Sequence, residues 1–336
     1  MHVHLHRRRT ARQVAFDPFK ANLQVALAPA RNLHPAHAQC LGNVLVLQTL
    51  RGQQHDAAWF EAQYNNRARV SDTPEILARW AQASVLARSR MTCELDVPYG
   101  DEPGESLDVF PARASGAPVL VYIHGGYWRA LDKSDHSFVA PSFVQAGAMV
   151  VVPNYALCPA VTIESIALQT ARALAWAWRH AAQYGGDPSR IHVIGHSAGG
   201  HLAAMLLCCH WKTVAADLPG RLLVGAMSIS GLYDLDPLRY APFLQTDLAL
   251  DAASVRRLSP AGFSRPRGPL MTLVGADESE EFLRQNRLIR ERWGAGAVPV
   301  CQTLEGLNHF SVLHDLVDPA GGAHRHALRL LGLARA

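Results

Sequence analysis

Six short apolar segments that alternate with segments of helical composition constrain the fold of this chain more than any other feature. The apolar segments are residues 119–123, 148–152, 191–194, 224–230, 270–274 and 298–304. Helices are expected near 134–146, 162–184, 198–210, 279–293 and 322–333. Such a pattern is typical of an α/β fold, with a mostly parallel sheet covered by helices on both faces. In these sheets the ligand crevice lies at the carboxyl ends of the strands, so functional residues are expected directly after strands.

The pattern predicts one folded domain over residues 56–336. Ahead of the alternating part, residues 73–90 predict a helix with Asp72 or Thr73 as its cap and Pro74 in its first turn. The segments CELDVPYG and SLDVF predict an antiparallel strand pair. Residues 1–55 hold seven of the 32 basic residues and one of the 28 acidic ones. We interpret residues 1–55 as a disordered extension or a stretch translated from too early a start.

Composition excludes several classes of protein. The apolar fraction of 49% against 18% charged residues predicts a sizeable buried core. Residues 56–336 carry the remaining 25 basic and 27 acidic residues, a net charge of −2, which argues against nucleic acid as a partner. No apolar run is long enough to span a membrane, and the six cysteines have no CxxC spacing. We therefore expect a cytoplasmic protein that acts on a small molecule; its oligomeric state is left open.

The segment VIGHSAGGHL carries the strongest chemical signal. It places Ser197 between a β-branched run and a helical segment, with glycines two residues before and after it. GxSxG on such a strand-to-helix turn is typical of an exposed nucleophilic serine. The alternative is a glycine-rich turn in which Ser197 only caps the helix.

Two further residues complete a nucleophile–base–acid set. Asp277 follows strand 270–274 and His309 follows strand 298–304, so the chain order is Ser, Asp, His. A serine hydroxyl needs an imidazole to take its proton, and the imidazole needs a carboxylate to orient it. Both assignments have rivals. The rival acids are Glu278, Glu280 and Glu281, and the other histidines considered are His196, His201 and His314.

The segment YIHGGYW supplies a candidate oxyanion hole. Gly125 and Gly126 follow strand 119–123 directly, and glycines allow backbone N–H groups to approach a substrate. The N–H of Ala198, directly after Ser197, would supply a further donor. The alternative is a loop whose glycines only permit a turn.

Together these motifs resemble the α/β-hydrolase superfamily, in its hormone-sensitive-lipase-like branch with an HGG oxyanion loop. More narrowly, HGGYW, GHSAGGHLAAML, SISGLYDLDPL and DESEEFLRQN resemble the arylformamidase (kynurenine formamidase) family. The resemblance implies hydrolysis of an N-formyl arylamine such as N-formylkynurenine, without a metal or another cofactor. It implies that Ser197 is the nucleophile, Asp277 the orienting acid and His309 the base.

Aromatic residues near these motifs are candidate substrate contacts. Tyr127 and Trp128 could form a flat wall for an aromatic substrate or merely pack the loop, and Tyr155 could line the same crevice. Residues 231–267 are longer than a simple connection needs and predict a lid. Its candidate contacts are Leu232, Tyr233 and Phe243, with internal packing as the alternative role.

The leading hypothesis is therefore a metal-independent serine hydrolase of small acyl amides or esters of aromatic compounds. A short-chain carboxylesterase would use the same residues. A non-catalytic binding protein on the same fold would not need the nucleophile, the base and the oxyanion glycines. A metal-dependent formamidase is disfavoured because no His/Asp cluster with ligand spacing occurs in residues 56–336.

Overall fold

The computed structural model describes residues 48–50 and 53–334. Most of the predicted extension, residues 1–55, lies outside the described residues. The part that is described forms a two-stranded antiparallel ladder of β1 (Gln48–Leu50) and β2 (Gln53–His55). The boundary at residue 56 stays a prediction. The Asp56 carboxylate accepts from the Trp59 N–H and caps the helix that follows β2.

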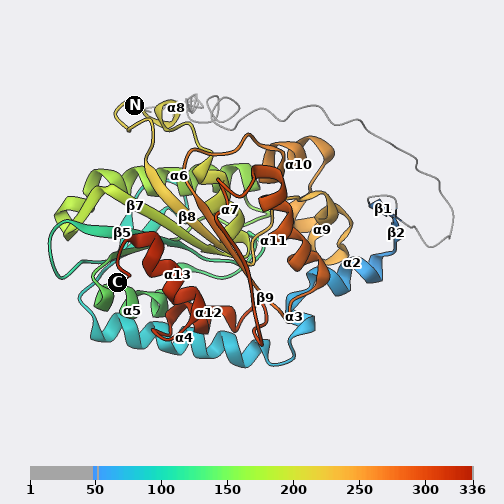
Figure 1. The fold of residues 1–336 in the computed structure, drawn as a ribbon, viewed down its shortest axis with the longest axis horizontal. Coiled ribbons are helices and arrows are strands. Elements are labelled where there is room, and N and C mark those ends of the chain that lie inside the picture. The colour runs from blue at the N-terminus through green and yellow to red at the C-terminus, as the bar shows by residue number, and fades with distance from the viewer. Residues whose placement is uncertain (1–47, 51–52, 335–336) are drawn as a thin grey trace, which may run out of the picture.

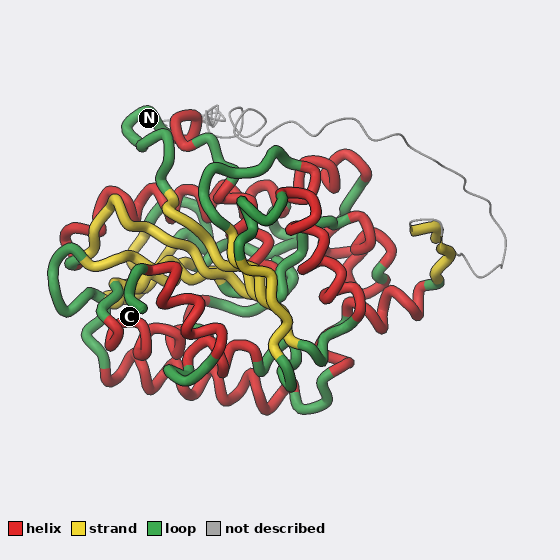
Figure 2. The backbone as a smooth tube through the Cα atoms, in the orientation of Figure 1, coloured by secondary structure: helices red, strands yellow, loops and turns green. Residues whose placement is uncertain are grey.

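One sheet of eight strands forms the centre of the described part of the molecule (Figures 1 and 2). Its strands are β3 (Glu94–Pro98), β4 (Ser106–Phe110), β5 (Ala117–Ile123), β6 (Met149–Pro153), β7 (Gly186–His196), β8 (Leu223–Ile229), β9 (Leu270–Gly275) and β10 (Val300–Leu304). Their spatial order is β10-β9-β8-β7-β5-β6-β4-β3. The six strands from β10 to β6 pair in parallel, and β4 and β3 join antiparallel. The predicted mostly parallel sheet and the predicted antiparallel pair are both confirmed.

Helices cover both faces of this sheet (Figure 1). Those in the apolar core on one face are α2 (Ala57–Tyr64), α6 (Ile163–His180), α7 (Ala198–Leu207) and α11 (Glu280–Trp293). Those on the other face are α4 (Thr73–Arg90), α5 (Ala140–Ala146), α12 (Val312–Val317) and α13 (Gly322–Leu331). Within the described residues, no helix is long and apolar enough to cross a membrane.

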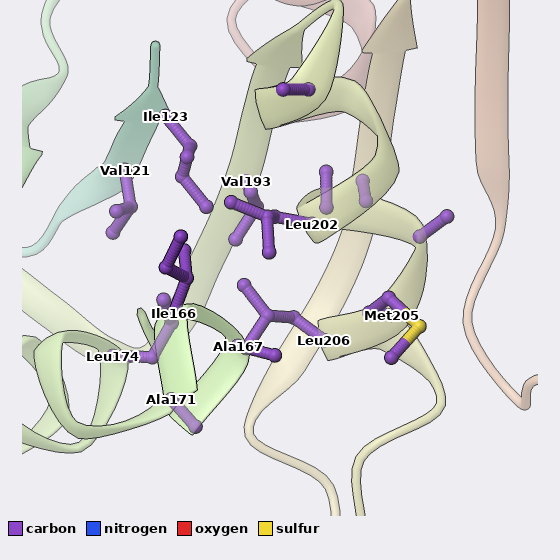
Figure 3. Packing of buried hydrophobic residues seen from close by; sticks show 14 of the residues in the cluster. Val121, Ile123, Ile166, Ala167, Ala171, Leu174, Val193, Leu202, Met205 and Leu206 are labelled. Atoms are coloured by element: carbon purple, nitrogen blue, oxygen red, sulfur yellow. The ribbon is translucent and has the colours of Figure 1, made fainter. Parts of the chain in front are cut away.

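The pleat of the central strands explains their continuous apolar sequence. Along β5, Val121 and Ile123 pack into the core on one face, whereas Leu120 and Tyr122 pack into the core on the other. Figure 3 shows the first of these cores, where Leu202 of α7 lies close to strand residues of β5 and β7. Because successive side chains are buried on opposite faces, these strands are fixed from both sides. They therefore hold the residues that follow them in fixed positions.

Element boundaries differ from the sequence-based expectation in several places, most clearly at two helices. The helix expected near 134–146 begins as two short 3₁₀ turns, η1 (Lys133–Asp135) and η2 (Ser137–Val139), and becomes α-helical only at α5. The helix expected near 162–184 ends at His180 and continues as the 3₁₀ turn η3 (Ala181–Tyr184). The helix expected at 73–90 is present with the expected bounds.

The segment 231–267 between β8 and β9 is mostly short helices. It contains η4 (Asp236–Tyr240), α9 (Pro242–Leu248), α10 (Ala252–Leu258) and η5 (Pro260–Gly262). Its function as a lid stays a prediction.

Candidate active site

Ser197 stands on a strained turn between β7 and α7. Its φ of 56° lies in the left-handed region, which costs a residue other than glycine about 1–3 kcal/mol. The flanking glycines make the turn sterically feasible: a Cβ on Gly195 would lie 2.0 Å from the Gly199 carbonyl oxygen. A Cβ on Gly199 would lie 2.0 Å from the Ile123 carbonyl oxygen. Because backbone carbonyl oxygens come so close, neither position has room for a side chain, and both must be glycine.

A hydrogen-bonded chain of three side chains begins at this serine. Nε2 of His309 lies 3.1 Å from Oγ of Ser197, and Nδ1 of His309 lies 2.6 Å from Oε2 of Glu278. All three residues are at least 95% buried. The contact with Glu278 places the proton on Nδ1 and leaves Nε2 free to accept the serine proton.

The acid that bonds to His309 is Glu278, and the prediction of Asp277 is wrong. Asp277 is exposed, and its backbone N–H donates to the Leu307 carbonyl at 3.0 Å. Glu278 points inward, where its Oε1 accepts from the Ser230 hydroxyl at 2.5 Å and from the Gly275 N–H at 2.9 Å. These donors hold the Glu278 carboxylate in place beneath the imidazole.

The other two candidate acids lie elsewhere. Glu280 is exposed at the start of α11. Glu281 accepts a hydrogen bond from the Tyr64 hydroxyl at 2.5 Å and forms an ion pair with Arg284. The hydrogen bond of His309 Nδ1 is to Glu278.

The rival histidines have structural contacts instead of a contact with Ser197. His196 lies beneath the His309 loop and donates from Nε2 to the His309 carbonyl at 2.7 Å. Burial, aided by nearby His309, holds the pKa of His196 well below its usual value, so its ring is neutral. His201 donates from Nε2 to the Leu258 carbonyl, and burial lowers its pKa to about 4. His314 contacts the Trp80 indole N–H at 3.3 Å.

The HGG loop lies against the serine turn. A Cβ on Gly125 would lie 3.1 Å from Cβ of Ser197, so the glycine backbone and the serine are in close approach. Gly126 has a φ of 108°, and a Cβ there would lie 2.1 Å from the Ala130 carbonyl oxygen. Ala198 is the first residue of α7, so its N–H has no partner within the helix. The structure brings together the three predicted oxyanion residues around Ser197.

Tyr155 supports this loop and does not line the cavity beside Ser197, so its prediction as a substrate contact is wrong. Its side chain is 1% exposed. Its hydroxyl donates to the His124 carbonyl at 2.9 Å and to the Gly125 carbonyl at 3.3 Å, and its ring stacks on His124 at 4.2 Å. It is therefore placed to position the oxyanion loop.

Trp128 is likewise absent from the cavity wall. Its side chain is fully buried, and its ring packs edge-on against His201 with 5.0 Å between centroids. The left-handed backbone at Tyr127 (φ 50°) and Trp128 (φ 55°) carries the chain around the turn while directing Trp128 into the core. Trp128 therefore packs the loop onto the domain, which was the alternative to its predicted contact with substrate.

A cavity of about 510 Å³ opens beside Ser197 and His309. Tyr127 and Phe243 line it as predicted, whereas Leu232 and Tyr233 are fully buried and do not. Its complete wall consists of Asn65, Asn66, Arg67, Ala68, Leu77, Trp80, Gly126, Tyr127, Arg129, Ala130, Leu131, His196, Ser197, Phe243, Asp247, His309 and Phe310.

One part of the wall was not foreseen from the sequence. It comprises α3 (Asn66–Arg69), the residue before it and the first half of α4. Hydrogen bonds fix this N-terminal segment to the active-site loops: the Tyr127 hydroxyl donates to the Tyr64 carbonyl at 2.6 Å, and the Ser279 hydroxyl donates to the Gln63 carbonyl at 2.6 Å. No motif marks these residues, because their place in the wall depends on tertiary packing.

Another part of the wall carries an ion pair. Arg129, after the HGG loop, pairs with Asp247 of α9, and its guanidinium lies 5.6 Å from the centre of the Phe243 ring. Segment 231–267 is thereby tied to the oxyanion loop. Among the described residues, no group of three or more His, Cys, Asp and Glu side chains could hold a metal ion.

The chain is similar to known hydrolases in sequence and in fold. A family model described as BD-FAE matches residues 107–215. The kynurenine formamidase of Danio rerio is 32% identical over 254 residues, covering 73% of this chain and 84% of its own. A candidate thioesterase from Silicibacter sp. TM1040 superimposes with a TM-score of 0.70 at 28% identity, over 81% of this chain and 99% of its own. Esterase B of Lactobacillus rhamnosis has the same fold, with a TM-score of 0.61 at 19% identity over 78% and 95% of the two chains.

Proposed function

This chain belongs to the kynurenine formamidase family of α/β-hydrolases, and we propose that it hydrolyses small acyl amides of aromatic amines, above all N-formyl arylamines. The observation that carries the proposal is the hydrogen-bonded set of Ser197, His309 and Glu278. Ser197 and His309 of this set line a cavity that also has aromatic side chains in its wall. The aromatic side chains of this wall are Trp80, Tyr127, Phe243 and Phe310. Flat rings of this kind bind an aryl leaving group by stacking and edge contacts.

The first half of the reaction forms an acyl-enzyme. Nε2 of His309 takes the Ser197 proton as the serine oxygen attacks the formyl carbon, and Glu278 stabilises the resulting imidazolium. The carbon–nitrogen bond then breaks, and His309 passes its proton to the leaving arylamine. The formyl group remains on the serine oxygen as an ester.

Water completes the cycle. His309 removes a proton from water, whose oxygen attacks the formyl ester, and the ester bond breaks with return of the proton to Ser197. The products are formate and the free enzyme. In both halves the tetrahedral oxyanion is stabilised by backbone N–H groups of Gly125, Gly126 and Ala198, an effect worth about 3 kcal/mol per donor in related sites.

A short-chain carboxylesterase is the second candidate. The same serine, base and acid cleave esters, and the chain shares its fold with esterase B. The two candidates differ in the leaving group, which is an amine in one case and an alcohol in the other.

The experiment compares kcat/KM for N-formylkynurenine and p-nitrophenyl acetate, with the wild-type protein and Ser197→Ala. Strong formamide turnover that is lost in Ser197→Ala supports the arylformamidase. Ester cleavage with little formamide turnover would replace it by the esterase. Activity that survives Ser197→Ala would overturn the catalytic assignment altogether, and binding without any turnover in the wild type would indicate a non-catalytic protein.

A further inference from the structure

The last turn of α2 connects the oxyanion loop with the turn that carries Glu278. Carbonyl groups in the last turn of a helix have no partner within the helix, so their donors come from elsewhere. The Tyr64 carbonyl accepts from the hydroxyl of Tyr127, which directly follows the HGG loop. The Gln63 carbonyl accepts from the hydroxyl of Ser279, which directly follows Glu278. Two successive carbonyls of α2 are therefore bonded to two different parts of the active site.

The Tyr64 side chain adds a buried hydrogen bond to the first turn of α11, against which α2 packs (Figure 1). Its hydroxyl donates to Oε2 of Glu281 at 2.5 Å, and the two residues are 0% and 4% exposed. Arg284 donates to both oxygens of the same carboxylate, at 2.8 and 2.9 Å. The Glu281 N–H in turn donates to Oε1 of Gln63 at 3.2 Å. Hydrogen bonds to an ionised carboxylate are the strong ones, so this set fixes the start of α11 relative to α2.

The first turn of α11 also contacts the imidazole of the active site. Phe282 is fully buried, and its ring lies edge-on to the His309 ring with 4.7 Å between centroids. On its other side, the Phe282 ring centroid lies 6.1 Å from that of Tyr64. Glu278 stands two residues before the helix begins at Glu280. The position of α11 therefore affects the base and the acid together.

We propose that Tyr64 is a positioning residue, which fixes the start of α11 and so holds His309 and Glu278 in their places. Tyr64 is fully buried and does not line the cavity beside Ser197, so it acts through these neighbours and not on the substrate. The inference rests on the proposed function, because it assigns catalysis to the same three side chains. A small displacement of an imidazole from the atoms it serves lowers the rate of the chemical step.

The test is Tyr64→Phe, which removes one oxygen atom and keeps the ring beside Phe282. The variant should lower kcat about 10-fold, by the same factor for N-formylkynurenine and for p-nitrophenyl acetate, because both substrates use the same base and acid. KM for each substrate should stay within about 2-fold of wild type, because Tyr64 lines no part of the cavity.

Tyr184→Phe is the matched control. It also removes a hydrogen bond from a tyrosine to a carboxylate, 2.7 Å from the Tyr184 hydroxyl to Oε2 of Glu94. Glu94 lies in β3, at the opposite edge of the sheet from β10, which His309 follows. The control should keep kcat within about 2-fold of wild type. Thermal unfolding of both variants separates a loss of stability from a loss of rate.

A double-mutant cycle tests whether Tyr64 acts through Glu281. Glu281→Leu removes the acceptor of the Tyr64 hydroxyl, so it should lower kcat at least as much as Tyr64→Phe does. In the double variant the two losses should not multiply, and kcat should stay within about 2-fold of that of Glu281→Leu. Tyr64→Phe and Tyr184→Phe decide the proposal even where Glu281→Leu does not fold.

A wild-type kcat in Tyr64→Phe, whatever its melting temperature, would overturn the proposal. A higher KM without a loss of kcat, or losses that multiply in the double variant, would overturn it as well. A wild-type protein that cleaves the ester and not the formamide would refute the proposed substrate instead, and the ester kinetics would still test Tyr64. Activity that survives Ser197→Ala would refute the proposed site and this inference together.

Discussion

Nδ1 of His309 lies 2.6 Å from Glu278, while Asp277, one residue earlier, is exposed to solvent. The two carboxylates differ by a single position, but the turn after β9 directs them to opposite sides. Glu278 is held by the Ser230 hydroxyl and the Gly275 N–H, and its longer side chain reaches the imidazole. The identity of the acid is therefore decided by donors from β9 and from the end of β8.

Replacing each of the two acids by its amide, in separate variants, tests this assignment. Glu278→Gln replaces the anion that stabilises the charged imidazole, so kcat should fall about 10³- to 10⁴-fold. Asp277→Asn removes an exposed charge and should leave kcat within about 3-fold of wild type. Steady-state kinetics on N-formylkynurenine or p-nitrophenyl acetate measures both. A large loss in Asp277→Asn with near-normal Glu278→Gln would restore the sequence-based assignment.

The sequence predicted those parts of the site that depend on local sterics. Gly195 and Gly199 must be glycine because the backbone itself comes too close, and this constraint is visible as a motif. Ser197 and His309 both follow parallel strands, so they lie at the same edge of the sheet whatever the detailed packing of the side chains. The six parallel strands and the helices on both faces follow from the same alternation.

Features that depend on side-chain direction were not predictable in this way. Trp128 and Tyr155 follow strands as substrate contacts would, yet the left-handed turn at Trp128 and the hydroxyl contacts of Tyr155 direct both into the interior. Asn66 lies far from every motif and reaches the cavity only because α2 packs against α11 and the HGG loop. No local pattern encodes such long-range packing.

The backbone of Gly126 offers a test of the oxyanion loop. Gly126→Ala places a Cβ 2.1 Å from the Ala130 carbonyl oxygen, so the loop must shift and kcat should fall about 10²- to 10³-fold. Gly116→Ala is the control, because Gly116 also has a positive φ (75°) but no atom within 4 Å of the added Cβ. Both variants should lose about 1 kcal/mol of stability from backbone strain, and only Gly126→Ala should lose activity. Thermal unfolding and kinetics separate the two effects; equal activity in both variants would contradict the role of the loop.

Tyr155 should act on the rate through the position of the same loop. Tyr155→Phe removes the hydroxyl that donates to the His124 and Gly125 carbonyls, so kcat should fall about 10-fold with little change in KM. Tyr99→Phe is the matched control: it removes a comparable bond, 2.7 Å to the Asn154 carbonyl, at a residue outside the cavity wall. The control should change stability and leave kcat within about 2-fold of wild type. A higher KM without a loss of kcat in Tyr155→Phe would instead indicate direct contact with substrate.

Buried neutral histidines should make the protein lose stability in mild acid. Burial lowers the pKa of His192 to about 4, below the value near 6.5 expected in the unfolded chain. Above pH 6.5 this residue is neutral in both states and has no effect on the pH dependence. As the pH falls from 6.5 toward 4, the unfolded chain binds the proton and the folded protein does not, so the free energy of unfolding decreases.

His192→Gln isolates this contribution, because His192 lies in β7 with its Nδ1 contacting the Arg190 carbonyl and lines no part of the cavity. Between pH 7.5 and pH 5.0, the free energy of unfolding of the variant should decrease by about 2 kcal/mol less than that of wild type. His136 and His201, whose pKa values burial lowers to about 3 and about 4, act in the same direction and remain in both proteins. Urea unfolding at the two pH values measures the difference. Parallel loss of stability in wild type and variant would mean that His192 takes up its proton in the folded state.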